Sequence, residues 1–169
     1  AQKSAEEKVL DALVGKKASK IWMGTFHSIF ARILRTEATK FNYKSNFSIY
    51  DKEDSVSLVN NIMNSLNLSF DNYNASSIQH KISNLKNQMI TPDEFLKHMA
   101  ESLPDQKIAE VYKEYNKRLF ENNSMDFDDL LLKPIELFNI NARVLQKYRK
   151  QFKYILVDEY QDTNNSQYL

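Results

Sequence analysis

The 169-residue sequence contains no cysteine and only two glycines and three prolines. The absence of cysteine excludes disulfides, thiolate nucleophiles and cysteine-based zinc sites, and it is compatible with a reducing cytoplasm. So few glycines and prolines favour a helical chain. No apolar run approaches the roughly 20 residues that a membrane span requires, and the polar start AQKSAEEK lacks a signal-peptide pattern. We therefore expect a helical, cytoplasmic protein without a membrane segment.

Hydrophobic residues make up 42% of the sequence and charged residues 27%, which suits a packed core beneath a charged surface. The net charge of +1 hides an uneven distribution. Residues 1–50 hold nine Lys or Arg against four Asp or Glu, whereas residues 151–169 hold one Lys against three acids. This asymmetry fits two sites with different partners, and it equally fits chance.

Apolar residues at helical spacing dominate the sequence between residues 26 and 150. In TPDEF, which begins at Thr91, proline and glutamate follow at the first and third helical positions, a strong start signal. Pro134 should kink or divide the helix in which it lies. Four residues that can cap a helix precede apolar stripes: Asp51, Thr91, Asp126 and Asn141.

Two short apolar segments have the pattern of strands: KIWMGT at residues 20–25 and KYILVDE at residues 153–159. About 125 residues of predicted helix separate them, whereas a parallel crossover needs only about a dozen. Two strands alone do not make a stable sheet. The sequence therefore predicts a mainly α fold, in which a helical subdomain is inserted into an incomplete parallel α/β domain that retains two short strands.

The second predicted strand ends in two carboxylates, Asp158 and Glu159. In open α/β sheets, ligands bind beyond the carboxyl ends of the strands. An aspartate there can help to hold Mg²⁺ on nucleotide phosphates, and a neighbouring glutamate can deprotonate an attacking water. Taken alone, the pair has a simpler alternative: a strand that ends at the surface and leads into a helix capped by Thr163 or Asn164.

Four segments resemble motifs of the UvrD/PcrA/Rep-type superfamily 1 DNA helicases, in the family's order and with similar spacing. They are TFHS at residues 25–28, NFSIYD at 46–51, MDFDDLL at 125–131 and VDEYQDTN at 157–164. The resemblance covers nearly the whole chain. It implies a P-loop NTPase-like motor domain, contributed by residues 1–29 and 151–169, with a helical subdomain inserted at residues 30–150.

The resemblance also implies a function: ATP-dependent movement from 3′ to 5′ on single-stranded DNA, coupled to duplex unwinding. The implied cofactors are ATP and Mg²⁺, and the implied partners are single-stranded and forked DNA. Asp158 would coordinate Mg²⁺ and Glu159 would be the catalytic base, while Gln161 and Asp162 would couple the nucleotide and DNA sites. A DNA contact is implied for the TFHS segment: Thr25, Phe26, His27 and Ser28.

The phosphate loop G-x-x-x-x-G-K-[ST], whose amides cradle nucleotide phosphates, is missing from the 169 residues. VGKKAS at residues 14–19 lacks the earlier glycine and has Lys17 where Ser or Thr should stand. The opening AQKSAEE resembles the end of the family's next conserved segment, so we expect the chain to begin after the phosphate loop. The isolated chain is then expected not to hydrolyse ATP, and its exposed strand edges are expected to pair between copies.

The carboxylates of Asp126, Asp128 and Asp129 raise the alternative of a divalent-cation site, as in a metal-dependent nuclease. Their spacing fits helix capping better, with Asp126 as the cap and the other two in the first turn. The resemblance implies that this segment lies near the DNA path. Because carboxylates repel phosphates, it would position donors there rather than touch the DNA backbone.

The residues around TFHS also have structural alternatives. Thr25 or Ser28 can simply cap a helix, with His27 packed beside it. Trp22 and Phe26 can stack on bases, although both rings fit an apolar core better. A non-catalytic DNA-binding or partner-binding helical module therefore stays open as a second function. Four cations can form either a phosphate-binding face or a solvated one: Arg32, Arg35, Lys40 and Lys44.

Overall fold

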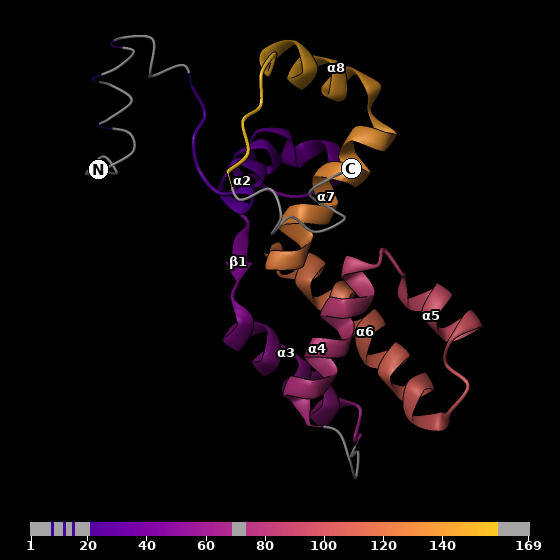
Figure 1. The fold of residues 1–169 in the computed structure, drawn as a ribbon. Coiled ribbons are helices and arrows are strands. Elements are labelled where there is room, and N and C mark those ends of the chain that lie inside the picture. Colours follow the sequence, from indigo (N-terminus) through magenta and orange to yellow (C-terminus); the bar gives the residue numbers. More distant parts are fainter. Residues whose placement is uncertain (1–7, 9–11, 13–14, 16–20, 69–73, 159–169) are drawn as a thin grey trace.

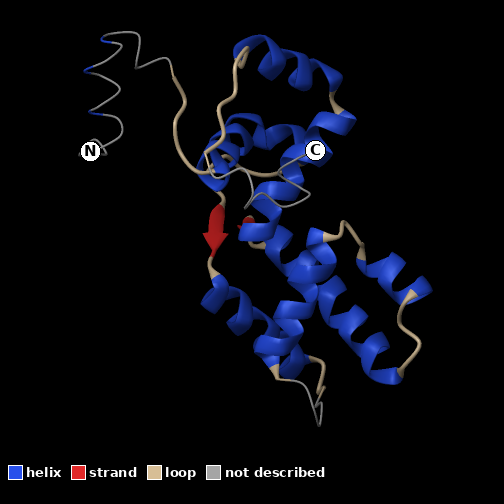
Figure 2. Cartoon of the chain, in the orientation of Figure 1, coloured by secondary structure: helices blue, strands red, loops and turns tan. Residues whose placement is uncertain are grey.

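The computed structural model describes residues 21–68 and 74–158, together with residues 8, 12 and 15. The described chain is mainly helical, as the sequence predicts (Figures 1 and 2). Its strands are β1 (Ser48–Tyr50) and β2 (Ser124–Asp126). Its helices are α2 (Phe26–Glu37), the short 3-10 helix η2 (Ala38–Phe41), α3 (Lys52–Ser65), α4 (Ala75–Asn87), α5 (Pro92–His98), α6 (Leu103–Glu121), α7 (Phe127–Ile140) and α8 (Ala142–Gln151).

The helices begin where the sequence supplies caps. The side chains of Asp51, Thr91 and Asp126 each accept a hydrogen bond from the backbone N–H three residues later. The carboxylate of that later residue in turn accepts a hydrogen bond from the backbone N–H of the cap residue. Asn141 caps α8 in the simpler one-way manner. Each cap satisfies an amide that the helix leaves unpaired and stabilises the helix by about 1 kcal/mol. All four predicted caps are therefore confirmed.

The two strands pair in parallel, with Ser48 opposite Ser124 and Tyr50 opposite Asp126. Neither is one of the two segments predicted from the sequence, because residues 21–25 and 154–158 form no strand. A strand needs a hydrogen-bonded neighbour, and the described residues offer neither apolar segment such a neighbour. In the described part of the chain, the predicted number of two short strands is right, and neither strand lies where it was predicted.

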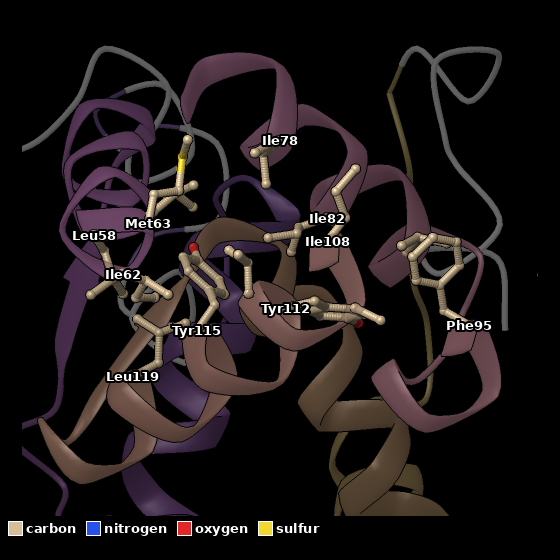
Figure 3. Close-up of a cluster of buried hydrophobic side chains, with 14 residues drawn as sticks. Leu58, Ile62, Met63, Ile78, Ile82, Phe95, Ile108, Tyr112, Tyr115 and Leu119 are labelled. Atoms are coloured by element: carbon tan, nitrogen blue, oxygen red, sulfur yellow. The ribbon is translucent and has the colours of Figure 1, made fainter. Parts of the chain in front are cut away.

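The principal core lies among α3, α4, α5 and α6 (Figure 3). Helical spacing brings apolar side chains of all four helices together, and burial of each large aliphatic side chain stabilises the fold by roughly 1.5–3 kcal/mol. The cluster comprises Leu58, Val59, Ile62, Met63, Ile78, Ile82, Leu85, Phe95, Ile108, Ala109, Val111, Tyr112, Tyr115 and Leu119. The stripes predicted on these helices are thus largely buried.

Helices α2, α7 and α8 gather at the other end of the molecule, beyond β1 (Figure 1). Ile33, Leu137, Val144 and Tyr148 form the buried centre of this second unit. Pro134 lies inside α7 and does not divide it, contrary to one of the two outcomes expected for it. Among the described residues, no helix combines the length and apolarity needed to cross a bilayer.

The predicted domain boundaries fall within helices. The boundary between residues 29 and 30 lies inside α2, and the boundary between residues 150 and 151 lies in the last turn of α8. Both α2 and α8 pack against α7, so residues on either side of each predicted boundary belong to one packed unit. The three-part division of the chain stays a prediction.

Candidate DNA and nucleotide site

The TFHS segment forms the start of α2. Thr25 has an extended backbone and caps the helix, with its Oγ1 accepting from the Ser28 N–H at 3.3 Å. The Ser28 hydroxyl in turn donates to the Thr25 carbonyl oxygen at 2.9 Å. Both side chains are exposed. The capping role weighed for Thr25 is confirmed, and it leaves both hydroxyls at the surface, where an added phosphate can reach them and the first amides of α2.

Gly24 fits this junction because it has no Cβ. Its φ is +156°, a conformation that side-chain-bearing residues rarely adopt. A Cβ placed there would collide with the Ser28 Oγ. The glycine therefore allows the chain to enter α2 closely enough for Ser28 to fold back on Thr25.

His27 brings two of the motif segments together. Its ring centroid lies 5.7 Å from that of Phe127, in an edge-on arrangement. Phe127 is the first residue of α7 and belongs to the MDFDDLL segment. It is 49% exposed, although helical spacing puts it on the same stripe as the buried Leu130 and Leu131. No local sequence signal distinguishes the half-exposed Phe127 from its buried neighbours.

Trp22 has a structural role. Its ring makes edge contacts with Tyr148 and Phe152, at centroid distances of 6.5 and 5.0 Å, and the Arg32 guanidinium lies 3.9 Å from its centroid. The preference for a core position is confirmed for Trp22. Phe26, at the start of α2, is partly buried, and its ring centroid lies 5.9 Å from that of Phe30.

Three of the four cations weighed for a phosphate-binding face have intramolecular side-chain partners: Arg32, Arg35 and Lys40. Arg35 donates from Nη1 to the carbonyl oxygens of Ser45 and Phe47, at 2.9 and 3.1 Å. Lys40 forms an ion pair with the buried Glu37. Together with the stacking of Arg32 on Trp22, these contacts favour the structural interpretation of this face.

Glu37 links α2 to α8. Its carboxylate accepts bonds from Lys40, from Lys147 at 2.5 Å and from the Tyr148 hydroxyl at 3.1 Å. Burial alone would raise the pKa of Glu37, but the bonds from Lys147, Lys40 and Tyr148 outweigh it and hold the pKa below its usual value. The charged form of Glu37 is therefore the form that the fold stabilises.

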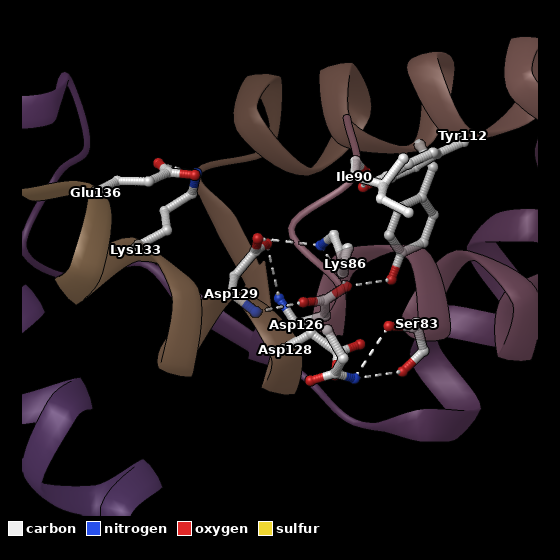
Figure 4. Close-up of polar contacts among 11 residues, drawn as sticks. Ser83, Lys86, Ile90, Tyr112, Asp126, Asp128, Asp129, Lys133 and Glu136 are labelled. Atoms are coloured by element: carbon white, nitrogen blue, oxygen red, sulfur yellow. Dashed lines mark hydrogen bonds and ion pairs between the residues drawn. The ribbon is translucent and has the colours of Figure 1, made fainter. Parts of the chain in front are cut away.

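The MDFDDLL segment contains a buried charge network (Figure 4). Lys86, near the end of α4, places its Nζ 2.7 Å from Oδ2 of Asp126 and 3.0 Å from Oδ1 of Asp129. The Tyr115 hydroxyl also donates to Asp126, at 2.9 Å. Asp126 meanwhile caps α7 by accepting from the Asp129 N–H at 2.8 Å. The capping prediction is confirmed, and the carboxylates have a further partner that the sequence analysis did not identify.

Burial and charge act in opposition in this network. Burial alone would lower the pKa of Lys86, but the Asp129 and Asp126 carboxylates outweigh it and raise that pKa well above normal. Burial also opposes ionisation of Asp126, yet Lys86 holds its pKa below normal. For Asp129, burial is not offset and the pKa is raised. The firmest ion pair is therefore that between Lys86 and Asp126.

The sequence contains a pattern that indicates the burial of Lys86. This lysine follows Ile78 and Ile82 at intervals of four residues and so lies on the buried stripe of α4. A lysine in such a stripe needs a buried carboxylate. Its neighbour Asn87 reaches the same segment and donates to Oδ1 of Asp128 at 3.0 Å. The end of α4 thus holds the first turn of α7, from which Phe127 extends to His27.

Of the four residues predicted for the nucleotide site, the structure describes only Asp158. It is exposed, at a bend after residues 154–157, which have no regular secondary structure, and not at the end of a strand. Glu159, Gln161 and Asp162 lie outside the described residues. In the part that is described, no three His, Asp or Glu side chains gather as a metal site. Mg²⁺ on a nucleotide needs only one or two protein carboxylates besides phosphates and water, so the role that the resemblance implies for Asp158 stays a prediction.

A cavity of about 330 Å³ lies beside the buried network. Lys86, Asp129, Tyr112 and Lys133 are among its lining residues. None of Thr25, His27 and Asp158 contributes to it. The cavity is therefore separate from the predicted DNA and nucleotide contacts.

Comparison with known proteins identifies close relatives along the whole chain. A family described as the UvrD/REP helicase N-terminal domain matches residues 1–169. The ATP-dependent DNA helicase PcrA of Bacillus subtilis is 41% identical over 169 residues, which are 100% of this chain and 23% of PcrA. The ATP-dependent DNA helicase UvrD1 of Mycobacterium tuberculosis is 42% identical over 160 residues, 93% of this chain and 21% of the relative. The chain thus spans less than a quarter of the curated relatives it matches.

Proposed function

The chain belongs to the UvrD/REP helicase N-terminal domain family, and we propose that it serves as part of an ATP-dependent DNA helicase or translocase. The proposed motor moves from 3′ to 5′ on single-stranded DNA and unwinds duplexes at forks. The proposal places it in the cytoplasm, with which the lack of cysteine is compatible.

The observation that carries the DNA side of this proposal is the contact between His27 and Phe127. It unites the TFHS segment, whose hydroxyls and helix amides suit a phosphate, with a half-exposed aromatic ring that suits an unpaired base. Because the Lys86 network anchors α7 one residue before Phe127, the ring is held on a rigid element. Thr25, Phe26, His27 and Ser28, joined by Phe127, form the proposed single-stranded DNA contact.

The nucleotide side rests on the residues that match VDEYQDTN. Asp158 would hold Mg²⁺, which when bound neutralises charge on the nucleotide phosphates. Glu159 would accept the proton of the attacking water. Gln161 and Asp162 would couple this site to the DNA contact. Since the 169 residues contain no phosphate loop, we propose that alone they do not hydrolyse ATP.

A chimaera tests the enzymatic proposal. The 169 residues replace the aligned segment of Bacillus subtilis PcrA, since the alignment covers the whole of this chain. DNA-stimulated ATP hydrolysis of the chimaera is then measured. Active hydrolysis that Glu159→Gln abolishes and Glu101→Gln preserves is expected; Glu101 is an exposed glutamate on the helical subdomain. A chimaera whose hydrolysis survives Glu159→Gln contradicts the assignment. Strand displacement from substrates with a 3′ or a 5′ tail then tests the direction.

The isolated chain gives a separate test. It is expected to bind a labelled oligo-dT and to show no Mg²⁺-dependent ATPase activity. Hydrolysis in a clean preparation that is lost on Glu159→Gln would overturn the proposed inactivity.

A second candidate function is a non-catalytic binding module. It is favoured by the hydrophobic core of α3, α4, α5 and α6, to which α2 and α8 contribute no residue. Salt separates the two candidates, because phosphate binding weakens steeply as salt rises. A partner-binding module would show no such dependence and no loss of binding on His27→Ala.

A further inference from the structure

Helix α8 and its flanks carry positive charge without any acid. From Leu137 to Val157 the sequence has five Lys or Arg and no Asp or Glu, in a chain whose total charge is only +1. Arg143, Lys147 and Lys150 follow one another at spacings of four and three residues, so they share one side of α8. All three are exposed. We refer to these three residues as the α8 cationic stripe.

The buried side of α8 fixes the orientation of the stripe. Val144 and Tyr148 are buried against Ile33 of α2 and Leu137 of α7. Because the helix is anchored by this face, the stripe is held on the outer surface. Residues of the chain just before TFHS pack on the same unit, since Trp22 contacts Tyr148.

Helix stability accounts for only part of the charge of the stripe. Arg143 lies in the first turn, which has no acid, and a cation there opposes the helix dipole. Lys147 has like charges both four residues before it and three residues after it, which are unfavourable pairs. The dipole favours cations only in the last turn, where Arg149 and Lys150 lie. Arg143 in particular lies where the helix dipole disfavours a cation, and no described residue pairs with it.

Neighbouring acids do not neutralise the stripe either. Lys147 pairs with Glu37, which also holds Lys40, so one carboxylate faces two ammonium groups. Arg143 and Lys150 have no ion pair or hydrogen-bond partner among the residues that the structure describes. Two full charges of the stripe therefore stay available to a ligand.

We propose that the α8 cationic stripe binds the phosphate backbone of a nucleic acid, as a contact separate from the TFHS segment. The proposal rests on the proposed function for the presence of DNA, but not on the chemistry of TFHS. Arg143 and Lys150 are seven residues apart, a rise of about 10 Å, so both can reach phosphates a few nucleotides apart on one strand of a nucleic acid. Evenly spaced anions are the ligand that such a row of cations fits.

The test compares two variants of equal charge in the 169-residue chain. Arg143→Gln with Lys150→Gln removes the free charges of the stripe and spares Lys147, which holds Glu37. Lys97→Gln with Lys107→Gln removes two exposed lysines from α5 and α6. Affinity for labelled oligo-dT is measured by fluorescence anisotropy across a series of NaCl concentrations, and urea unfolding checks that both variants are folded.

The slope of log affinity against log salt is expected to become shallower by about 1.4 in the stripe variant, since each lost phosphate contact on a single strand accounts for about 0.7. The control variant is expected to keep the wild-type slope. Equal slopes in the two variants overturn the proposal, because the effect is then one of net charge. Polyglutamate that competes as well as the oligonucleotide also overturns it and indicates an acidic protein partner.

His27→Ala separates this inference from the proposed function. If His27→Ala weakens binding and the stripe variant does not, the inference fails and the DNA contact at TFHS stands. If only the stripe variant weakens binding, the inference stands and the TFHS contact fails. A wild-type chain that does not bind oligo-dT at all contradicts both.

Discussion

The Nζ atom of Lys86 lies 2.7 Å from Oδ2 of Asp126, and both side chains are almost completely buried. The pair joins the last turn of α4 to the cap of α7 and so connects the main helical core to the motif segment that carries Phe127. Removing one member of such a pair leaves a charge that water cannot reach.

Lys86→Met should therefore lower the free energy of unfolding by about 3–5 kcal/mol, because Asp126 and Asp129 lose their cation. Lys81→Met is the matched control on the same helix. Lys81 pairs with Asp105 at a partly exposed position, so its loss should cost only about 0–1 kcal/mol. Urea denaturation of both variants measures the difference, and equal losses would show that the Lys86 pair adds nothing beyond a surface ion pair.

Glu37 should give the fold a measurable pH dependence. Its pKa in the folded chain lies below its usual value of 4.5. Its contribution to stability is therefore fully present above pH 4.5 and is lost as the pH falls through the folded-state pKa. Glu37→Gln should lose about 2 kcal/mol at neutral pH, since it forfeits hydrogen bonds to a charged group.

The measurement for Glu37 is urea unfolding at a series of pH values. The difference between wild type and Glu37→Gln should shrink on acidification below pH 4.5. The exposed Glu101→Gln serves as control and should follow the wild type throughout. A difference for Glu37→Gln that stays constant with pH would show that the carboxylate is not ionised by preference in the folded chain.

Phe127→Ala should lower affinity for oligo-dT by roughly tenfold or more, the usual effect of losing one base-stacking ring. Fold stability should change little, because the ring is 49% exposed. Phe120→Ala is the control, since Phe120 is 48% exposed on α6 and contacts Tyr43 instead of His27. Fluorescence anisotropy measures both variants, and a similar loss in Phe120→Ala would argue against a specific contact at Phe127.

Residues 154–157 should promote self-association at high concentration. Tyr154, Ile155 and Leu156 are 91%, 75% and 98% exposed, and such an extended apolar segment invites pairing with another copy. Leu156→Lys should shift the equilibrium toward monomer in sedimentation experiments. Leu103→Lys, at a 73% exposed leucine on α6, should not. A wild-type chain that stays strictly monomeric would contradict the prediction.

The helices were predictable because their signals are local. Asp51, Thr91 and Asp126 are caps whose partners lie three residues away, and the apolar stripes repeat within single helices. The strands were not predictable, because a strand forms only with a neighbour that sequence spacing does not reveal. SIY and SMD are too short to stand out, yet they are the segments that pair.

For the candidate site, the sequence by itself predicted which segments carry chemistry: TFHS, MDFDDLL and VDEYQDTN. Only the tertiary structure decided that His27 meets Phe127, and that Lys86 reaches an aspartate 40 residues further along the chain. The physical reason is that capping and helical periodicity act over a few residues. Burial of a charge and exposure of a ring depend instead on which distant helix lies beside them.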